Sequence, residues 1–216
     1  MQVRLVAVSQ PVSDLCKTPE DLLAYCARVS NPANQANSET APRLLAYLVR
    51  NQHWSPFEMA SMTLEIRTTR DIARQILRHR SFSFQEFSQR YATAVGEPVL
   101  REARMQDTKN RQASNSTEDR DLQAWWRSHQ QMVARTANDV YATALGKGIA
   151  KEVARSVLPE GMTESVLYMA GTVRSWIHYC DLRTDASTQK EHREVAMACR
   201  EVLLREFPSL SQVLAG

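Results

Sequence analysis

Residues 78–90 read RHRSFSFQEFSQR and concentrate side chains that could bind an anion. They include four basic side chains and the hydroxyl group of Ser88: Arg78, His79, Arg80 and Arg90 are the basic residues. Arginine presents a planar set of N–H donors that can hold a phosphate through parallel hydrogen bonds, and a hydroxyl can add another donor. No acidic residue has the spacing needed to neutralise most of this charge. The segment therefore predicts a site for a phosphate-bearing ligand.

The helix expected just before this segment carries positive charge along one face. Arg70, Arg74 and Arg78 recur at intervals of four residues, whereas the apolar residues between them face the core. Like charges at this spacing repel by roughly 0.2–0.5 kcal/mol per pair. A solvated basic face explains this helix equally well. The continuation of the charge beyond Arg78 favours a bound ligand.

Ser88 could bind a phosphate group or act as a nucleophile. A serine nucleophile needs a base beside it in space, and His79 is a candidate for that base. The spacing along the chain does not establish that the two meet. A hydroxyl that binds ligand is therefore the favoured role.

Other segments contain polar residues that could serve the same site. They are His53 and Glu58 in HWSPFE, Arg155 in VARSVLP, and Arg174, His178 and Arg183 in GTVRSWIHYCDLR. Taken alone, each arginine is typical of a surface residue, and a lone histidine is typical of a hydrogen-bonded structural group. Arg174 and His178 share a helix face, and Glu58 could pair with an arginine of the basic cluster.

The hydrophobic pattern predicts mostly helices with a modest antiparallel sheet, which is the α+β class, in one domain spanning residues 1–216. Strands are expected over residues 3–9 and 59–68. Helices are expected from residue 19 to before Pro32 and over 39–51, 70–79, 117–145, 149–157, 163–179 and 187–205. The polar residues 96–120 predict an exposed, partly mobile segment whose arginines are solvated.

The helix expected over residues 117–145 repeats large apolar side chains near a period of 3.6 residues. These side chains are Leu122, Trp125, Trp126, Met132, Val133, Val140, Tyr141 and Leu145. We interpret this face as core or as a subunit interface rather than as a platform for a cofactor.

Composition excludes several classes of protein. No apolar run is long enough for a membrane span, and the first residues lack a secretion signal, so a cytoplasmic location is expected. A net charge of +3 is too small to predict nucleic-acid binding by itself. The cysteines lie far apart, which favours reduced structural thiols and no metal site: Cys16, Cys26, Cys180 and Cys199.

These segments together resemble one enzyme family. Arg78-His79-Arg80, followed after seven residues by Ser88, is similar to the RHR-x7-S signature of the flavin-dependent thymidylate synthases. HWSPFE resembles the family's H-x-[ST]-x-F-E element, and VARSVLP and the run over residues 174–193 resemble its C-terminal half. The matches occur in order over residues 20–205.

The resemblance implies conversion of dUMP to dTMP, with methylenetetrahydrofolate as carbon donor, FAD as cofactor and NADPH as reductant. It also implies a family-specific fold and a homotetramer whose active sites draw on several subunits. Arg183 would lie against the uracil ring and favour ionisation at N3, which makes it the catalytic residue. No cysteine nucleophile is expected, although Cys180 lies near His178.

The resemblance also assigns binding residues. Those expected at dUMP are Gln75, Ile76, Leu77, Arg78, Glu86, Phe87, Ser88, Gln89, Arg90, Arg155 and Arg183. Those expected at FAD are His53, Ser55, Glu58, Arg78, His79, Arg80, Glu86, Thr172, Val173, Arg174 and His178.

The sequence departs from the family's pattern at Met59, Thr172 and Ser187, where histidine, asparagine and histidine are common. These departures leave the catalytic groups intact but bear on flavin and folate contacts. Alternatives stay open: a C5-methylase of UMP or another pyrimidine nucleotide, a nucleic-acid-binding protein, or a flavoprotein without methyl transfer. The modest net charge argues against the second, and Ser88, Arg155 and Arg183 argue against the third.

Overall fold

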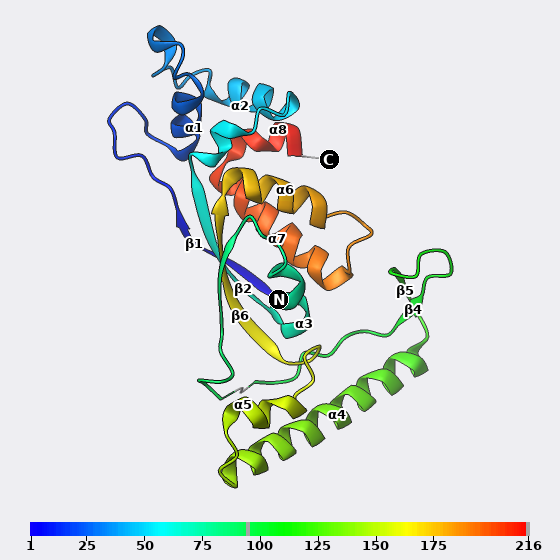
Figure 1. The fold of residues 1–216 in the computed structure, drawn as a ribbon. Helices are drawn as coiled ribbons and strands as arrows, with labels where there is room; N and C mark the ends of the chain where they lie inside the picture. The colour runs from blue at the N-terminus through cyan, green and yellow to red at the C-terminus, as the bar shows by residue number, and fades with distance from the viewer. Residues whose placement is uncertain (94–95, 215–216) are drawn as a thin grey trace.

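A four-stranded antiparallel sheet, with strand order β1-β2-β6-β3, lies at the centre of the chain (Figure 1). The structure is a computed structural model that describes residues 1–93 and 96–214. The strands are β1 (Gln2–Val8), β2 (Ser61–Thr69), β6 (Glu164–Thr172) and β3 (Ser83–Glu86). The expected α+β class is confirmed.

Strand β2 forms because its side chains alternate between the core and the other face of the sheet. Met62, Leu64 and Ile66 are at most 1% exposed. Strand β2 pairs with β6 along its whole length, from Ser61 opposite Thr172 to the other end of the strand. This register brings the segment before β2 next to the helix that follows β6.

Helices α3 (Arg70–Ile76), α6 (Val173–Arg183) and α7 (Lys190–Glu206) pack against the sheet (Figure 1). Trp176 and Tyr179 of α6 are at most 1% exposed and supply much of the core between these layers. Burial of such large aromatic side chains contributes most of the favourable free energy of packing. The shorter elements at one end are α1 (Pro19–Ala27), η1 (Pro32–Asn34), α2 (Ala41–Arg50), η2 (Ser55–Glu58), η4 (Pro208–Leu210) and α8 (Ser211–Leu214).

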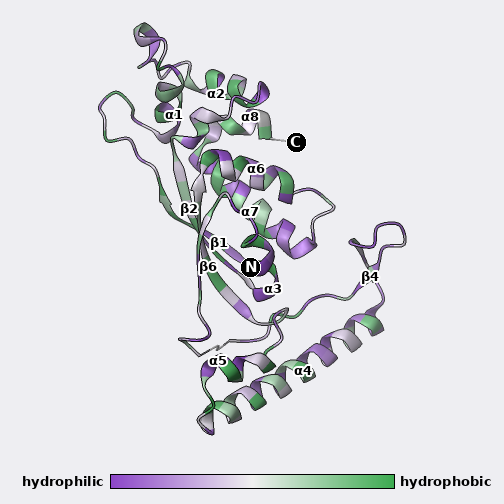
Figure 2. Ribbon diagram, in the orientation of Figure 1, coloured by the Kyte–Doolittle hydropathy of each residue, from purple (hydrophilic) through white to green (hydrophobic). Residues whose placement is uncertain are grey.

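Helix α4 (Arg120–Gly146) lies at the opposite end of the molecule from α1 and α2 (Figure 1). Its neighbours are α5 (Lys151–Ala154) and η3 (Arg155–Val157), and hydrophobic residues recur along it between hydrophilic ones (Figure 2). Gly148, at φ +81°, follows the helix and adopts a backbone conformation that favours glycine. None of the described helices is both long and apolar enough to cross a membrane.

The helix expected over residues 163–179 is wrong in its first half. Residues Glu164–Thr172 form strand β6, and the helix begins only at Val173. Leucine, methionine and alanine favour helices locally, but the burial of Ser165, Leu167 and Met169 alternates with a period of two. Pairing with strands on both sides overrides the local preference.

Residues 96–120 are mostly exposed, but the expectation that their arginines are solvated is wrong for Arg101 and Arg104. A short hairpin of β4 (Arg104–Gln106) and β5 (Ser114–Ser116) forms there. Arg101 bonds to Asp71 at 2.9 Å, and Arg104 bonds to Glu191 at 2.7 Å, with side chains only 21% and 13% exposed. These ion pairs join the segment to the body of the protein.

Candidate active site

His79 and Arg183, which are distant in sequence, meet where α3 and α6 end. Nε of Arg183 donates a hydrogen bond to Nε2 of His79 at 3.0 Å, and the His79 ring packs edge-on against Tyr179. Burial, together with the charge of Arg183, lowers the pKa of His79 to about 4. The imidazole is therefore neutral at pH 7 and can accept this bond, which fixes a permanent cation at the end of α6.

Arg78 and Arg80 are the sequence neighbours of His79, and both are exposed. Within residues 1–93 and 96–214, neither side chain makes a hydrogen bond or an ion pair with the protein. Exposed guanidinium groups next to a fixed cation suit a ligand with several negative charges, such as a diphosphate. The donor set here therefore fits the phosphate groups of FAD or of a nucleotide.

The other arginines of α3 are neutralised, contrary to the sequence-based expectation. Arg70 and Arg74 lie 3.6 and 3.3 Å from carboxylate oxygens of Glu86, and both lie 3.7 Å from Glu160. Glu86 also accepts a hydrogen bond from Ser165 at 2.9 Å. The fold, rather than spacing along the helix, brings these carboxylates to α3, so a pattern within one segment could not reveal them.

A second group of predicted flavin ligands lies where η2 meets the start of α6. Glu58 pairs with Arg174 at 2.5 Å, so its partner lies outside the basic cluster to which the sequence analysis assigned it. The ring of His178 packs against Trp54 at a centroid distance of 4.5 Å. Thr172 is the N-cap of α6.

A third group surrounds an open cavity of about 530 Å³ that Ser88 and Arg90 line together with α5. Nε of Arg90 lies 3.4 Å from a carboxylate oxygen of Glu152. Arg155 donates to the backbone carbonyl oxygen of Glu152 at 3.4 Å. Arg90, Lys151 and the Ser88 hydroxyl line this cavity and can bind a phosphate, whereas Arg155 does not line it and contacts its neighbour Glu152 instead.

The other predicted residues differ in how far their side chains are exposed. Ile76 and Val173 are fully buried, which leaves only their backbones for a ligand, and Gln89 is 3% exposed. Phe87 is 39% exposed, Leu77 is half-buried, and Ser55 and His53 are exposed. Gln75 donates to Gln189 at 2.8 Å.

The sequence analysis missed the residues that support Gln75 and His79. They are Tyr179, Gln189 and His192, of which Tyr179 and His192 are only 1% exposed. Gln189 lies in the segment that carries the family resemblance, and this resemblance could have pointed to it. Nothing in the helical pattern singles out His192. In the described part of the chain, no cluster of three metal-ligating side chains occurs.

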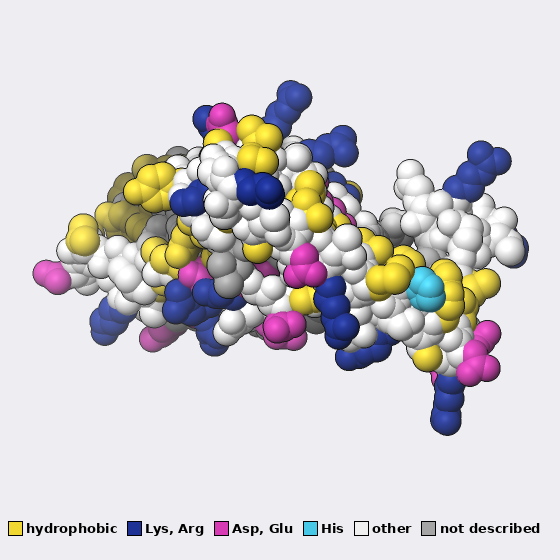
Figure 3. Space-filling view, turned by 90° about the horizontal axis from the view of Figure 1, so that it is seen from below, with side chains coloured by type: hydrophobic (Ala, Val, Ile, Leu, Met, Phe, Trp, Pro, Cys, Tyr) yellow, Lys and Arg dark blue, Asp and Glu magenta, His cyan; other side chains and the backbone are white. Residues whose placement is uncertain are grey.

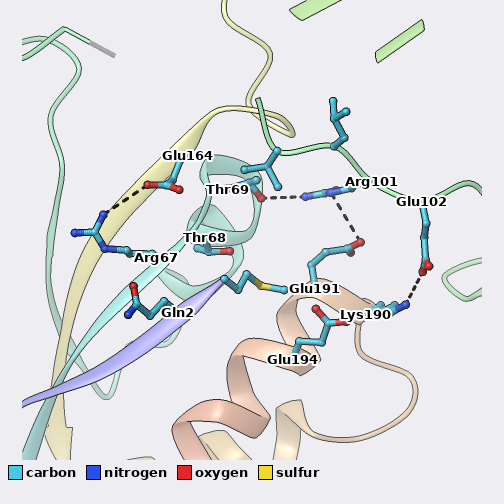
Figure 4. Close-up of a pocket in the computed structure, with 13 residues that line it drawn as sticks. Gln2, Arg67, Thr68, Thr69, Arg101, Glu102, Glu164, Lys190, Glu191 and Glu194 are labelled. Atoms are coloured by element: carbon cyan, nitrogen blue, oxygen red, sulfur yellow. Dashed lines mark hydrogen bonds and ion pairs between the residues drawn. The ribbon is translucent and has the colours of Figure 1, made fainter. Parts of the chain in front are cut away.

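A mixed-charge pocket of about 450 Å³ near the start of β1 contains none of the predicted residues (Figure 4). Its lining pairs opposite charges: Lys190 bonds to Glu102 at 2.5 Å, and Arg101 lies 3.9 Å from Glu191. The predicted residues instead form the separate groups described above, at different places on one chain.

The chain is similar to known proteins over nearly its whole length. The model of the family described as thymidylate synthase complementing protein matches residues 12–209. The chain is 51% identical to a probable flavin-dependent thymidylate synthase of Paramecium bursaria Chlorella virus 1, over 99% of both chains. It is also 51% identical to a flavin-dependent thymidylate synthase of Synechocystis, again over 99% of both.

A solved structure has a similar fold. It is a UMP/dUMP methylase, PolB, from Streptomyces cacaoi, bound with 5-Br dUMP. Its TM-score is 0.81 at 28% identity, and the match covers 98% of this chain and 94% of that one. A second structure of the same methylase contains 5-Br UMP.

Proposed function

Because the chain belongs to the family of flavin-dependent thymidylate synthases, we propose that it converts dUMP to dTMP by FAD-dependent reductive methylation. The proposed carbon donor is 5,10-methylenetetrahydrofolate, and the proposed reductant is NADPH. The observation that carries the proposal is the contact of Arg183 with neutral His79, beside the exposed Arg78 and Arg80. This arrangement supports binding of an anionic nucleotide next to an anionic cofactor.

Arg183 has the properties that the proposed reaction needs at the uracil ring. A guanidinium group stays charged at every relevant pH, and His79 holds it in place, so it can stabilise negative charge at N3 without reorganising. Loss of the N3 proton would increase the electron density at C5, which would then attack the methylene carbon of the folate. Loss of the C5 proton and cleavage of the bond between this carbon and the folate nitrogen would release tetrahydrofolate. Bound FAD, once reduced, supplies the hydride that completes the methyl group.

Three of the four cysteines support a mechanism without a thiolate nucleophile. Burial raises the pKa of Cys180 to about 12, and it raises the pKa of Cys199 well above the ordinary value. Burial also raises the pKa of Cys16, with a further contribution from Asp21. These thiols would be almost entirely protonated at pH 7, and a protonated thiol is a poor nucleophile.

The nucleotide phosphate is assigned to the cavity that Ser88 and Arg90 line, where Lys151 supplies a second cation. An anion entering this cavity would replace the carboxylate of Glu152 as the partner of Arg90. Replacement of an exposed ion pair by a phosphate held through parallel hydrogen bonds favours binding.

A homotetramer is the proposed assembly, as in the family. Helix α4 supports it, because the helix has two apolar faces. Ala134, Ala137 and Tyr141 pack against the body, whereas Trp125 and Val133 are 54% and 48% exposed. Large apolar side chains exposed along one helix mark a surface for another protein, here a second copy of this chain. Association of copies could also bring the separate groups of site residues together.

A second candidate substrate is UMP, since the structurally similar PolB is described as a UMP/dUMP methylase. The two relatives at 51% identity are described as thymidylate synthases, and this similarity favours dUMP as the substrate proposed for this chain. Turnover of each nucleotide, measured side by side, separates the two substrates.

The first test is an absorption spectrum of the purified protein, before and after addition of dUMP under oxidising conditions. We expect a flavin band that shifts when dUMP binds, and dTMP formation when folate and NADPH are added. Arg80→Ala should weaken FAD binding, whereas the same change at exposed Arg43 should not. A colourless protein that takes up no added FAD would contradict the proposal.

A further inference from the structure

A chain of hydrogen bonds runs from α6 through α7 to the predicted dUMP ligand Gln75. The Tyr179 hydroxyl lies 3.2 Å from Nε2 of His192, and Nδ1 of His192 lies 3.2 Å from Oε1 of Gln75. Nε2 of Gln75 donates to Oε1 of Gln189 at 2.8 Å, and Nε2 of Gln189 donates to Glu191 at 3.0 Å. Glu191, which lines the pocket in Figure 4, ends the chain.

The carboxylate of Glu191, at the end of this series of hydrogen bonds, sets the direction of every bond in the series. Glu191 can only accept, and it also accepts from Arg104 at 2.7 Å, so the Gln189 amide must donate to it. Oε1 of Gln189 then accepts from Gln75, whose own Oε1 must accept from a proton on Nδ1 of His192. Nε2 of His192 is left to accept from the Tyr179 hydroxyl. Each amide and the imidazole ring therefore has one orientation.

The surroundings of His192 require that it stay neutral. Its side chain is 1% exposed, and Arg183 and the ring of His79, 6.2 Å away, face it. A second ring proton could bond only to the Tyr179 hydroxyl oxygen, and it would place a buried charge beside Arg183, so burial and this cation lower the pKa of His192 to about 4. The same chain therefore also fixes the hydroxyl of Tyr179, against whose ring His79 packs at 5.0 Å.

We propose that His192 is a positioning residue for the nucleotide site, because it locks the Gln75 amide so that one of its N–H groups stays available to the substrate. This inference rests on the proposed function, which names the nucleotide and makes Gln75 one of its ligands. Across residues 1–93 and 96–214, the Gln75 amide has no further partner than His192 and Gln189. Without the bond from His192, the bond to Gln189 alone would hold the amide, and its second N–H group would be aimed less firmly at the substrate.

The test compares His192→Asn, which keeps a donor near the position of Nδ1, with His192→Leu, which removes it. We expect the KM for dUMP to rise about tenfold in His192→Leu, the effect of one lost hydrogen bond, with kcat changed less than about twofold. His192→Asn should recover most of the affinity. An equal loss in both variants, or an unchanged KM in His192→Leu, would overturn the proposal.

A measurement on the unsubstituted protein needs neither activity nor a variant that folds. The ring nitrogens of the protein labelled with ¹⁵N-histidine should show His192 as a neutral ring with its proton on Nδ1 at about pH 5.5, roughly one unit below the ordinary pKa of histidine. A proton on Nε2, or a charged ring, would overturn the proposal. Absence of dTMP formation with this signal present would instead remove only the proposed function.

Discussion

Arg183 combines a permanent charge with a fixed position, because it donates to His79 at 3.0 Å. We expect Arg183→Ala to lower dTMP formation by about 10²–10³-fold, the usual effect of removing a group that stabilises a developing anion. Flavin absorbance should not change. The check is single-turnover formation of dTMP, with Arg43→Ala as the control. Normal turnover would remove Arg183 from the chemistry.

Arg90 is expected to contact the nucleotide phosphate. Arg90→Ala should weaken dUMP binding by about 1.5–3 kcal/mol, the value of a hydrogen bond to a charged group. Glu152→Gln is the matched control, because it frees Arg90 from the pair at 3.4 Å and should leave dUMP affinity unchanged or higher. Both affinities can be read from the shift of the flavin band. A normal dissociation constant for Arg90→Ala would contradict the phosphate assignment.

His79 and His192 make stability depend on pH. Burial is the main cause that lowers both pKa values to about 4, from about 6.5 in an unfolded chain. Between these values the unfolded chain binds more protons, so the free energy of unfolding should fall as the pH falls from about 6.5 to 4. Each histidine contributes up to about 1.4 kcal/mol per pH unit. Urea unfolding across this range is the measurement, and His192→Leu should show a shallower dependence.

At the residue scale, the sequence was informative where chemistry lies within one segment. The cluster at residues 78–90 and Arg183 were both identified, and the structure brings His79 to Arg183. What the sequence could not reveal are partners that the fold brings to Arg70 and Arg74: Glu86 from strand β3, and Glu160 from the turn before β6. Sheet pairing joins residues far apart in sequence, and no local spacing encodes it.

At the scale of elements, strand β6 positions both halves of the predicted flavin site. Gly171, near the end of this strand, permits the ring of Phe82 to pack closely against the backbone. A Cβ at Gly171 would lie 2.4 Å from the ring of Phe82, which is itself packed against Trp176 at 4.8 Å. Gly171→Ala should therefore destabilise the protein by about 1–3 kcal/mol, the usual cost of overpacking. Thermal or urea unfolding measures the change.

The control for Gly171→Ala is the double variant with Phe82→Leu. If the clash with the ring is the cause, the double variant should be more stable than the sum of the two single effects predicts. Strict additivity would show that the cause lies elsewhere. Strand β6 was also the element that sequence reasoning mistook for a helix, because its neighbours on both sides, β2 and β3, lie far away in sequence.

At the scale of the whole molecule, α4 leaves hydrophobic side chains exposed on the face seen from below (Figure 3). The sequence predicted this helix and its apolar repeat, but it could not decide between a core and an interface. The structure places Ala134 and Tyr141 inward and leaves Trp125, Trp126 and Val133 exposed. Burial of the second face would require another chain.

The interface interpretation predicts the effect of a charge on each side of α4. If the exposed face of α4 joins copies of this chain, Val133→Glu would bury a carboxylate against apolar side chains of a second copy, which is costly, so the proposed tetramer should dissociate into smaller species. Ala142→Glu, at an exposed position of the same helix that lies on neither apolar face, should leave the assembly intact. Light scattering coupled to size exclusion gives the mass of each variant. If dUMP binds across subunits, Val133→Glu should also lose dUMP affinity while its secondary structure is retained. A tetrameric Val133→Glu variant, or an unsubstituted protein that is monomeric, would mean that the exposed face of α4 does not join copies of this chain.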